Sequence, residues 1–259
     1  MLKKIIVVIA FVFALFACGN DNNYPDVATK EYRVADASEL NIFQFERRKN
    51  IVVTLLEGEE QKIVFKTEEK LLSYLSCEVI DDVLSIHGND NQKYDGSLFE
   101  IQICGYSFNK IKLENAQLTG NANTIGGDDI EMDLKGASSI SINHLEANSI
   151  SIKETGASEV EINKLVVDKV LTDLKGASKV NLSGSANSLD LALANASTGL
   201  LCNLVANTAN ITVATASELE LTVKEKIEGK ASDASMIKYF NYDPLVDVLC
   251  TTASTISKK

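Results

Sequence analysis

The second half of the chain repeats the tripeptide Gly-Ala-Ser, or a degenerate form of it, about every 20 residues. The alanine is present in all eight copies, as Ala116, Ala137, Ala157, Ala177, Ala196, Ala216, Ala234 and Ala253. Successive alanines are 18 to 21 residues apart. A fixed period of this length is the signature of a solenoid, in which each repeat forms one coil and buries its apolar side chains against its neighbours.

Apolar residues occupy alternate positions on both sides of the repeated alanine. Around Ala137 these residues are Ile130, Met132, Leu134, Ile140 and Ile142. A period of two is typical of a strand with one buried face, so each coil is expected to contain two such strands. Leu145, Leu165 and Leu204 recur further along the copies and indicate a third, shorter side.

We therefore predict an all-β fold, a right-handed parallel β-helix with three sides and about 20 residues per coil. The handedness follows because crossovers between parallel strands are almost always right-handed. Neighbouring coils would lie about 4.8 Å apart, so the repeat region would form a rod of roughly 34 Å.

The tripeptide itself is expected to form the corner between the two main strands. The residue before the alanine is Gly, Asn or Asp in six of the eight copies, and these types tolerate the left-handed conformation of a sharp turn. We expect the alanine to face inward, where only a methyl group fits. The serines are expected to stack as a ladder of hydroxyls bonded to turn backbone. No copy pairs its serine with a histidine, so the ladder is interpreted as structural and not as a row of nucleophiles.

The first residues have the pattern of an export signal. Lys3 and Lys4 precede an apolar run that is shorter than the roughly 20 residues needed to span a bilayer as a helix. Leu15-Phe16-Ala17-Cys18 resembles a bacterial lipobox. We predict a signal peptide over residues 1–17, lipidation at Cys18 and a flexible tether over residues 18–29. The chain is then a lipoprotein of the outer membrane that faces either the cell surface or the periplasm.

Residues 30–110 are rich in strand patterns but lack the regular period. Strands are expected over residues 51–56, 62–66, 83–87 and 99–103, and a short helix within residues 68–75. We interpret this region as irregular coils with a cap, because the bare end of a β-solenoid is an adhesive edge. Residues 111–259 are assigned to the regular coils.

The net charge and the constant coil length exclude several classes of function. The formal net charge is −11, so binding to nucleic acid is not expected. Coils of nearly constant length leave no inserted loops to wall a catalytic cleft, and we expect no enzyme activity, no metal and no cofactor. Two acidic features offer alternatives to this expectation. Asp128-Asp129 is a candidate calcium site, and Glu154, which interrupts an apolar column, is either a buried functional acid or part of a bulge.

Aromatic residues gather near the C-terminal coils. Tyr239, Phe240 and Tyr242 either form a ligand-binding patch that stacks on sugar rings or cover the end of the core. The sequence leaves open whether Cys77, Cys104, Cys202 and Cys250 form disulfides.

The signal with its lipobox, the irregular strand-rich start and the twenty-residue Gly-Ala-Ser coils together resemble the putative auto-transporter adhesin head GIN domain family, over residues 33–240. The resemblance implies a β-helical domain of the cell envelope, found largely in Bacteroidetes, and supplies no catalytic residues. We expect a non-catalytic, lipid-anchored protein for adhesion or surface interaction, whose partners are the membrane, through its anchor, and a glycan or protein of the envelope. The alternatives are a carbohydrate-binding or carbohydrate-active β-helix and a structural partner domain of an envelope assembly.

Overall fold

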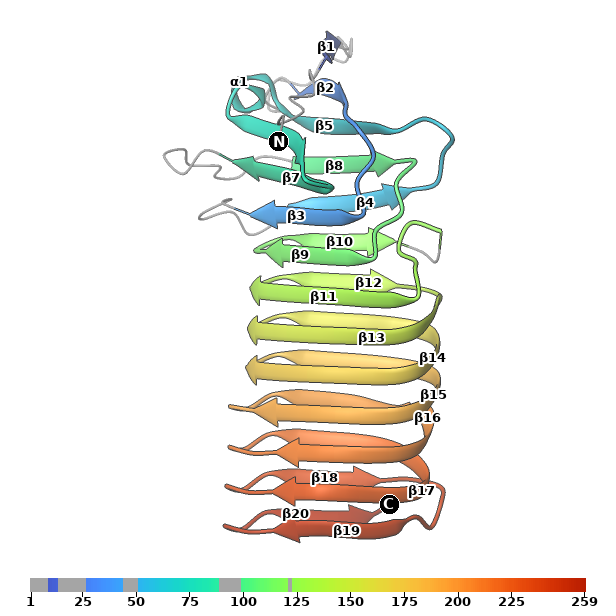
Figure 1. Cartoon of the computed structure of the whole chain (residues 1–259). Coiled ribbons are helices and arrows are strands. Elements are labelled where there is room, and N and C mark those ends of the chain that lie inside the picture. The colour runs from blue at the N-terminus through green and yellow to red at the C-terminus, as the bar shows by residue number, and fades with distance from the viewer. Residues whose placement is uncertain (1–8, 14–26, 44–50, 89–98, 121–122) are drawn as a thin grey trace, which may run out of the picture.

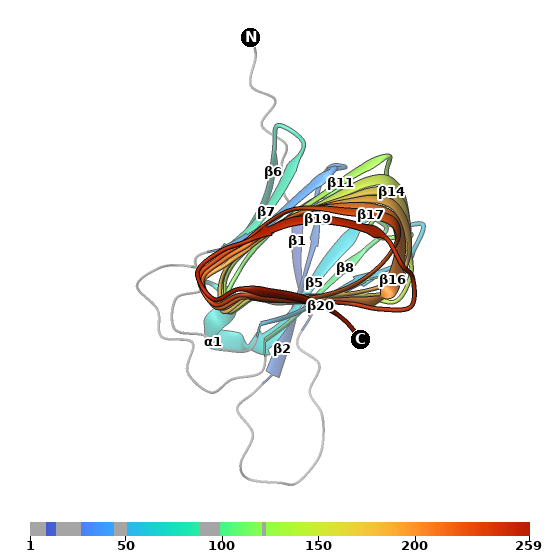
Figure 2. The ribbon, with the colours of Figure 1, turned by 90° about the horizontal axis from the view of Figure 1, so that it is seen from below.

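A computed structural model describes residues 9–13, 27–43, 51–88, 99–120 and 123–259. These residues form a rod of stacked coils that runs from a capped N-terminal end to the C-terminal coil (Figure 1). Seen along the rod, each coil is flattened, with two long faces joined on one side by a corner and on the other by a shorter third side (Figure 2). Viewed from the N-terminal end, the chain turns clockwise as it moves away from the viewer, which makes the helix right-handed (Figure 1). The predicted right-handed, three-sided parallel β-helix is confirmed.

The two long faces are parallel sheets. Along the first face the short strands are β3 (Glu39–Phe43), β7 (Val83–Gly88), β9 (Lys110–Glu114), β11 (Asp129–Gly136) and β19 (Leu245–Cys250). Along the second face they are β4 (Val52–Leu56), β8 (Phe99–Cys104), β10 (Gln117–Gly120), β12 (Ser139–Ile142), β18 (Met236–Tyr239) and β20 (Thr255–Lys258).

The middle of the rod is built from longer strands that continue around the third side. These are β13 (Leu145–Gly156), β14 (Glu159–Gly176), β15 (Lys179–Ala194), β16 (Thr198–Val213) and β17 (Glu218–Ala231). Their register pairs Leu145 with Leu165, two of the residues that indicated the third side, and it also pairs Ala147 with Val167. Register shifts near Leu165 and Gly184 mark where the long strands bend.

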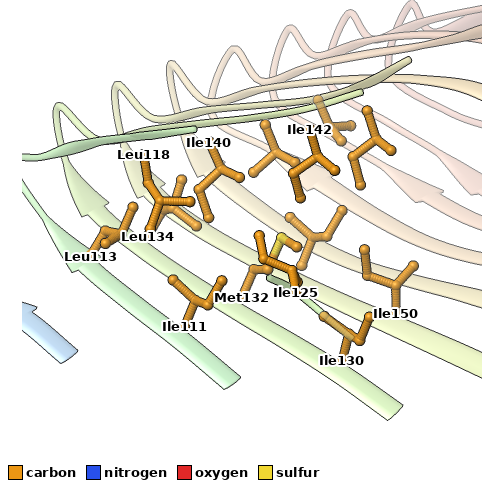
Figure 3. Packing of buried hydrophobic residues seen from close by; sticks show 14 of the residues in the cluster. Ile111, Leu113, Leu118, Ile125, Ile130, Met132, Leu134, Ile140, Ile142 and Ile150 are labelled. Atoms are coloured by element: carbon orange, nitrogen blue, oxygen red, sulfur yellow. The ribbon is translucent and has the colours of Figure 1, made fainter. Parts of the chain in front are cut away.

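The core is the continuous column of side chains that the alternating pattern turns inward (Figure 3). Ile111, Met132 and Ile152, which follow one another in one column, are at most 1% exposed. Burying an isoleucine or leucine side chain contributes about 1.5–3 kcal/mol, so repeated burial along the column is the main stabilising term. Because each coil contacts only adjacent coils, this stability is distributed along the axis.

The N-terminal region closes the rod with strands that are not stacked in chain order. β3 lies between β7 and β9 on one face, and β4 lies between β8 and β10 on the other. Beyond this layer, β2 (Val27–Arg33) and β5 (Lys62–Glu68) extend the second sheet as antiparallel strands from β8. β6 (Leu75–Ile80) pairs with β7 as an antiparallel hairpin.

The strands expected in residues 51–103 are all present, and the expected helix is shorter than its pattern. α1 covers only Glu69–Leu72, because the chain turns there and enters β6, a strand that the sequence analysis missed. β1 (Ile9–Phe13) pairs antiparallel with β2, so part of the predicted signal segment lies against the outermost strand of the cap. Its removal during export stays a prediction.

Candidate functional site

The residue before each alanine has a positive φ in all eight coils. The φ values range from +51° to +104° at Asn115, Gly136, Gly156, Gly176, Asn195, Thr215, Asp233 and Thr252. The corner therefore needs the left-handed conformation in every coil, as its Gly, Asn and Asp residues predicted.

The serines of the repeat are buried and bonded to backbone. Ser138, Ser178 and Ser197 are at most 2% exposed. Their hydroxyls donate to the carbonyl oxygens three residues earlier, of Lys135 at 2.7 Å, of Lys175 at 2.8 Å and of Ala194 at 2.6 Å. The predicted hydroxyl ladder is thus present, and its geometry is that of a turn.

The inward orientation expected for the alanines holds only for Ala116, which is 1% exposed, and is wrong for the other seven. Ala137, Ala157 and Ala177 are exposed, and the serine that follows each of them points inward. The reason is the carbonyl acceptors inside the corner, which a serine hydroxyl satisfies and a methyl group cannot.

Replacing Ser178 with alanine should lower the free energy of unfolding by about 1 kcal/mol, because the Lys175 carbonyl loses its buried donor. The matched control is Ala177→Ser at the neighbouring exposed position, which should change stability by less than about 0.5 kcal/mol. Urea denaturation of the two variants measures both values. Equal effects at positions 177 and 178 would contradict the assigned roles.

Glu154 is a buried acid in an unbroken strand. Its side chain is 0% exposed, and the parallel register places it between Leu134 and Leu174 with no bulge. Neither carboxyl oxygen has a hydrogen-bond partner. The nearby Lys179 backbone N–H lowers the pKa of the carboxyl and so offsets part of the rise that burial causes. Burial raises the pKa of Glu154 to about 8. A carboxyl enclosed within the rod cannot reach a substrate, so we assign it no catalytic role.

The aromatic residues near the C-terminal coils are spread over different environments. Tyr239 is half-buried and packs against the core, Phe240 is also half-buried, and Tyr242 is 39% exposed. Tyr239 therefore supports the interpretation that this cluster covers the core. Its role as a ligand-binding patch stays a prediction.

Cys18, the predicted lipidation site, lies outside the described residues. Cys77, Cys104, Cys202 and Cys250 are free thiols in the structure. Burial raises the pKa of the Cys77 thiol to about 12, so it is protonated at neutral pH.

Within the described residues, no three His, Cys, Asp or Glu side chains are grouped to hold a metal ion. Asp129 instead accepts a hydrogen bond from the Ser149 hydroxyl at 2.5 Å. In the same part of the chain, no helix is long and apolar enough to cross a bilayer.

A shallow groove of about 830 Å³ runs along the third side of the rod. It crosses successive coils from Gly127 and Asp128 at one end to Lys224 at the other, and polar side chains line most of it. One line of outward side chains follows the register Glu146, Val166, Ser185 and Val205. A second line, two strand positions further on, consists of Asn148, Asp168, Asn187 and Asn207.

This groove was not predicted from the sequence. The asparagines and Asp168 follow the alanines of their coils at nearly constant distance, and that column of polar residues was the available signal. It could not be recognised as a concave surface, because the hollow depends on how sharply the strands bend around the third side.

Sequence and structure comparisons show which known proteins this chain resembles. A sequence model of the family described as "Putative auto-transporter adhesin, head GIN domain" matches residues 46–242. No curated protein matches the chain.

Crystal structures of three proteins share its fold. A putative lipid binding protein from Parabacteroides distasonis has a TM-score of 0.78 at 13% identity, covering 90% of this chain and 96% of its own. A putative adhesin from Parabacteroides merdae has a TM-score of 0.73 at 14% identity, with the same two coverages of 90% and 96%. A putative adhesin from Bacteroides fragilis has a TM-score of 0.65 at 15% identity, with coverages of 90% and 97%. At these identities the likeness concerns the fold.

Proposed function

Because this chain belongs to the putative auto-transporter adhesin, head GIN domain family, we propose that it is a non-catalytic, lipid-anchored rod that makes adhesive contacts at the cell envelope. The observation that carries the proposal is the regular stacking of coils. Outward side chains of successive coils align in register along the three sides, and the third side has an open groove in place of a deep cleft. A surface of this kind suits contact with an extended partner.

The serine hydroxyls and histidine rings that a hydrolytic site would use already have other partners. The corner serines donate to backbone carbonyls, and His144 bonds to Glu146 at 2.8 Å. The ring of His87 stacks on Phe43. In the described part of the chain neither histidine is paired with a repeat serine, which supports a binding role over hydrolysis.

The predicted anchor would orient the rod. Cys18 is the first residue of the tether predicted over residues 18–29, whose last three residues instead belong to β2 (Val27–Arg33), at the capped end. Lipidation there would hold the cap beside the membrane and direct the C-terminal coils away from it. The groove on the third side would then run along the membrane normal.

Replacing Cys18 with alanine should abolish labelling of the protein by fatty acids and release it from the membrane fraction, because the thioether-linked chains supply the anchor. The matched control is Cys250→Ala, which removes an exposed thiol of the C-terminal coil and should leave labelling unchanged. Metabolic labelling with a tagged fatty acid, followed by membrane fractionation, measures both. Full membrane retention of the Cys18 variant would exclude the proposed anchor.

The adhesive role requires that the rod face outward, and protease treatment of intact cells tests this. Loss of the protein, with a periplasmic marker intact, is the expected result. Protection of the protein in cells whose known surface proteins are cut would place it in the periplasm and overturn an adhesive role.

A further inference from the structure

Small residues lie along the groove on the third side, and one of them lets the backbones of neighbouring coils approach closely. At Gly184 φ is +132°, and an added Cβ would lie 2.0 Å from the Leu165 carbonyl oxygen. Ala147 and Ala186 occupy inward positions on the same side, where the long faces carry leucine and isoleucine. Gly184, Ala147 and Ala186 all line the groove, and their short or absent side chains leave it open.

Amide and carboxylate groups are spaced along this hollow at the repeat of the coils. Asn148, Asp168, Asn187 and Asn207 occupy corresponding positions on successive coils, about 4.8 Å apart. That spacing is close to the length of one sugar ring in a linear glycan. The Asn207 side-chain amide donates to the Asn187 carbonyl oxygen at 2.8 Å, which leaves the Asn187 amide group free to donate and the Asn207 carbonyl oxygen free to accept.

A short apolar strip lies beside this polar line. Val166 is 42% exposed, and Val205 lies two coils further on, with Ser185 between them in register. Sugar rings present C–H groups on one face and hydroxyls at their edge. A groove with valines next to a row of carboxamides offers a contact to both.

The charges of the lining select against acidic ligands. Asp128, Glu146 and Asp168 line the groove together with Lys224, and the whole chain carries a net charge of −11. Sialylated, sulfated and uronate-containing glycans would be repelled by this field.

From these features we propose that the groove binds a neutral linear oligosaccharide that lies parallel to the axis of the rod. The inference rests on the proposed adhesive role and names its ligand class. Each sugar unit faces one coil, with hydroxyls bonded to the Asn and Asp side chains and ring faces on the two valines.

The test is an array of immobilised glycans that carries neutral, sialylated, sulfated and uronate-containing members, probed with the full chain in detergent. Binding to neutral linear glycans, in preference to acidic ones, is expected. Preference for acidic glycans, or no binding to any neutral glycan, would overturn the proposal. Selective binding of a cationic peptide that neutral oligosaccharides do not displace would also overturn it.

Two matched variants locate the site. The double variant Asn187→Ala/Asn207→Ala should weaken binding of the best neutral glycan at least about tenfold. The control, Asn143→Ala/Asn163→Ala, removes a similar pair of bonded asparagines outside the groove, whose Nδ2 and Oδ1 atoms are 3.3 Å apart, and should leave affinity unchanged.

Ser185→Trp places a bulky side chain at an exposed position in the groove and should block binding even if the amide variant is destabilised. Equal affinities in the groove variants and the control would exclude this site. The two proposals fail separately. A protein that is accessible to protease but binds no neutral glycan refutes only the groove assignment, whereas glycan binding by a protein confined to the periplasm refutes only the adhesive role.

Discussion

Replacing Glu154 with leucine should stabilise the rod, by more at pH 9 than at pH 5. The side chain lies in an inward column between Leu134 and Leu174, and neither of its oxygens is hydrogen-bonded. Even the neutral carboxyl is costly there, because an unpaired buried polar group destabilises by about 1–3 kcal/mol. A leucine continues the apolar column and removes that cost.

The pH dependence follows from the direction of the pKa change. Burial raises the pKa of Glu154 from an ordinary value of 4.5 to about 8. Between these values the folded chain keeps its proton while the unfolded chain has lost it, so the free energy of unfolding falls as the pH rises. The loss is complete above about pH 8 and amounts to something on the order of 5 kcal/mol.

Urea denaturation of the native protein, Glu154→Leu and Glu154→Gln between pH 5 and pH 9 measures the effect. The glutamine variant keeps the shape of the side chain and removes its titration, so its stability should lose the downward trend that the native protein shows. The control is Glu114→Leu. Glu114 is exposed, so this change should alter stability little. Parallel pH profiles for the native and glutamine proteins would contradict the assignment.

Replacing Gly229 with alanine should destabilise the last coils by at least about 3 kcal/mol. Its φ is +133°, and an added Cβ would lie 1.9 Å from the Ile211 carbonyl oxygen of the preceding coil. Relief of this clash requires that β17 move away from β16, with loss of ladder hydrogen bonds and of core contacts. The strain cannot be relieved by a side-chain rotation, because the obstacle is backbone.

Hydrogen exchange should show where the damage lies. Coils are stabilised by their neighbours, so residues 226–259 should lose protection while the coils around β13 and β14 keep it. The control is Gly58→Ala, whose added Cβ would be no closer than 3.8 Å to any neighbour and which should be nearly neutral. Unchanged protection beyond residue 226 in the Gly229 variant would refute the predicted contact.

The alternating pattern predicts the regular coils because every coil meets the same environment. Ile130, Ile150 and Val170 occupy one position of the repeat, and all are buried in register. The position of a residue in the repeat therefore also determines which residues of the neighbouring coils it contacts. The exchange of roles between Ala and Ser at the corner was not predictable in this way, since both are small and the choice depends on carbonyls that only the folded turn brings together.

The periodic pattern does not predict the strand pairing of the cap or the shape of the groove. Strands such as β4 and β8 were visible as patterns, but their pairing joins segments separated by some fifty residues with no repeat to set the register. The groove depends on the sharpness of the bend near Gly184, where register shifts. Glu154 was recognised as an interruption of its column, and its burial without a partner required the structure.

The position of β3 and β4 inside the cap bears on how the chain reaches its native state. Both strands are enclosed by neighbours that follow them in the sequence, namely β7 and β9 on one face and β8 and β10 on the other. A polypeptide that emerges from its N-terminus cannot complete this layer before β10, which ends at Gly120, is available. From then on, each coil has a finished template on which to form. An N-terminal fragment that ends before β9 would therefore lack the strands that cover β3 and β4 on the side of the regular coils.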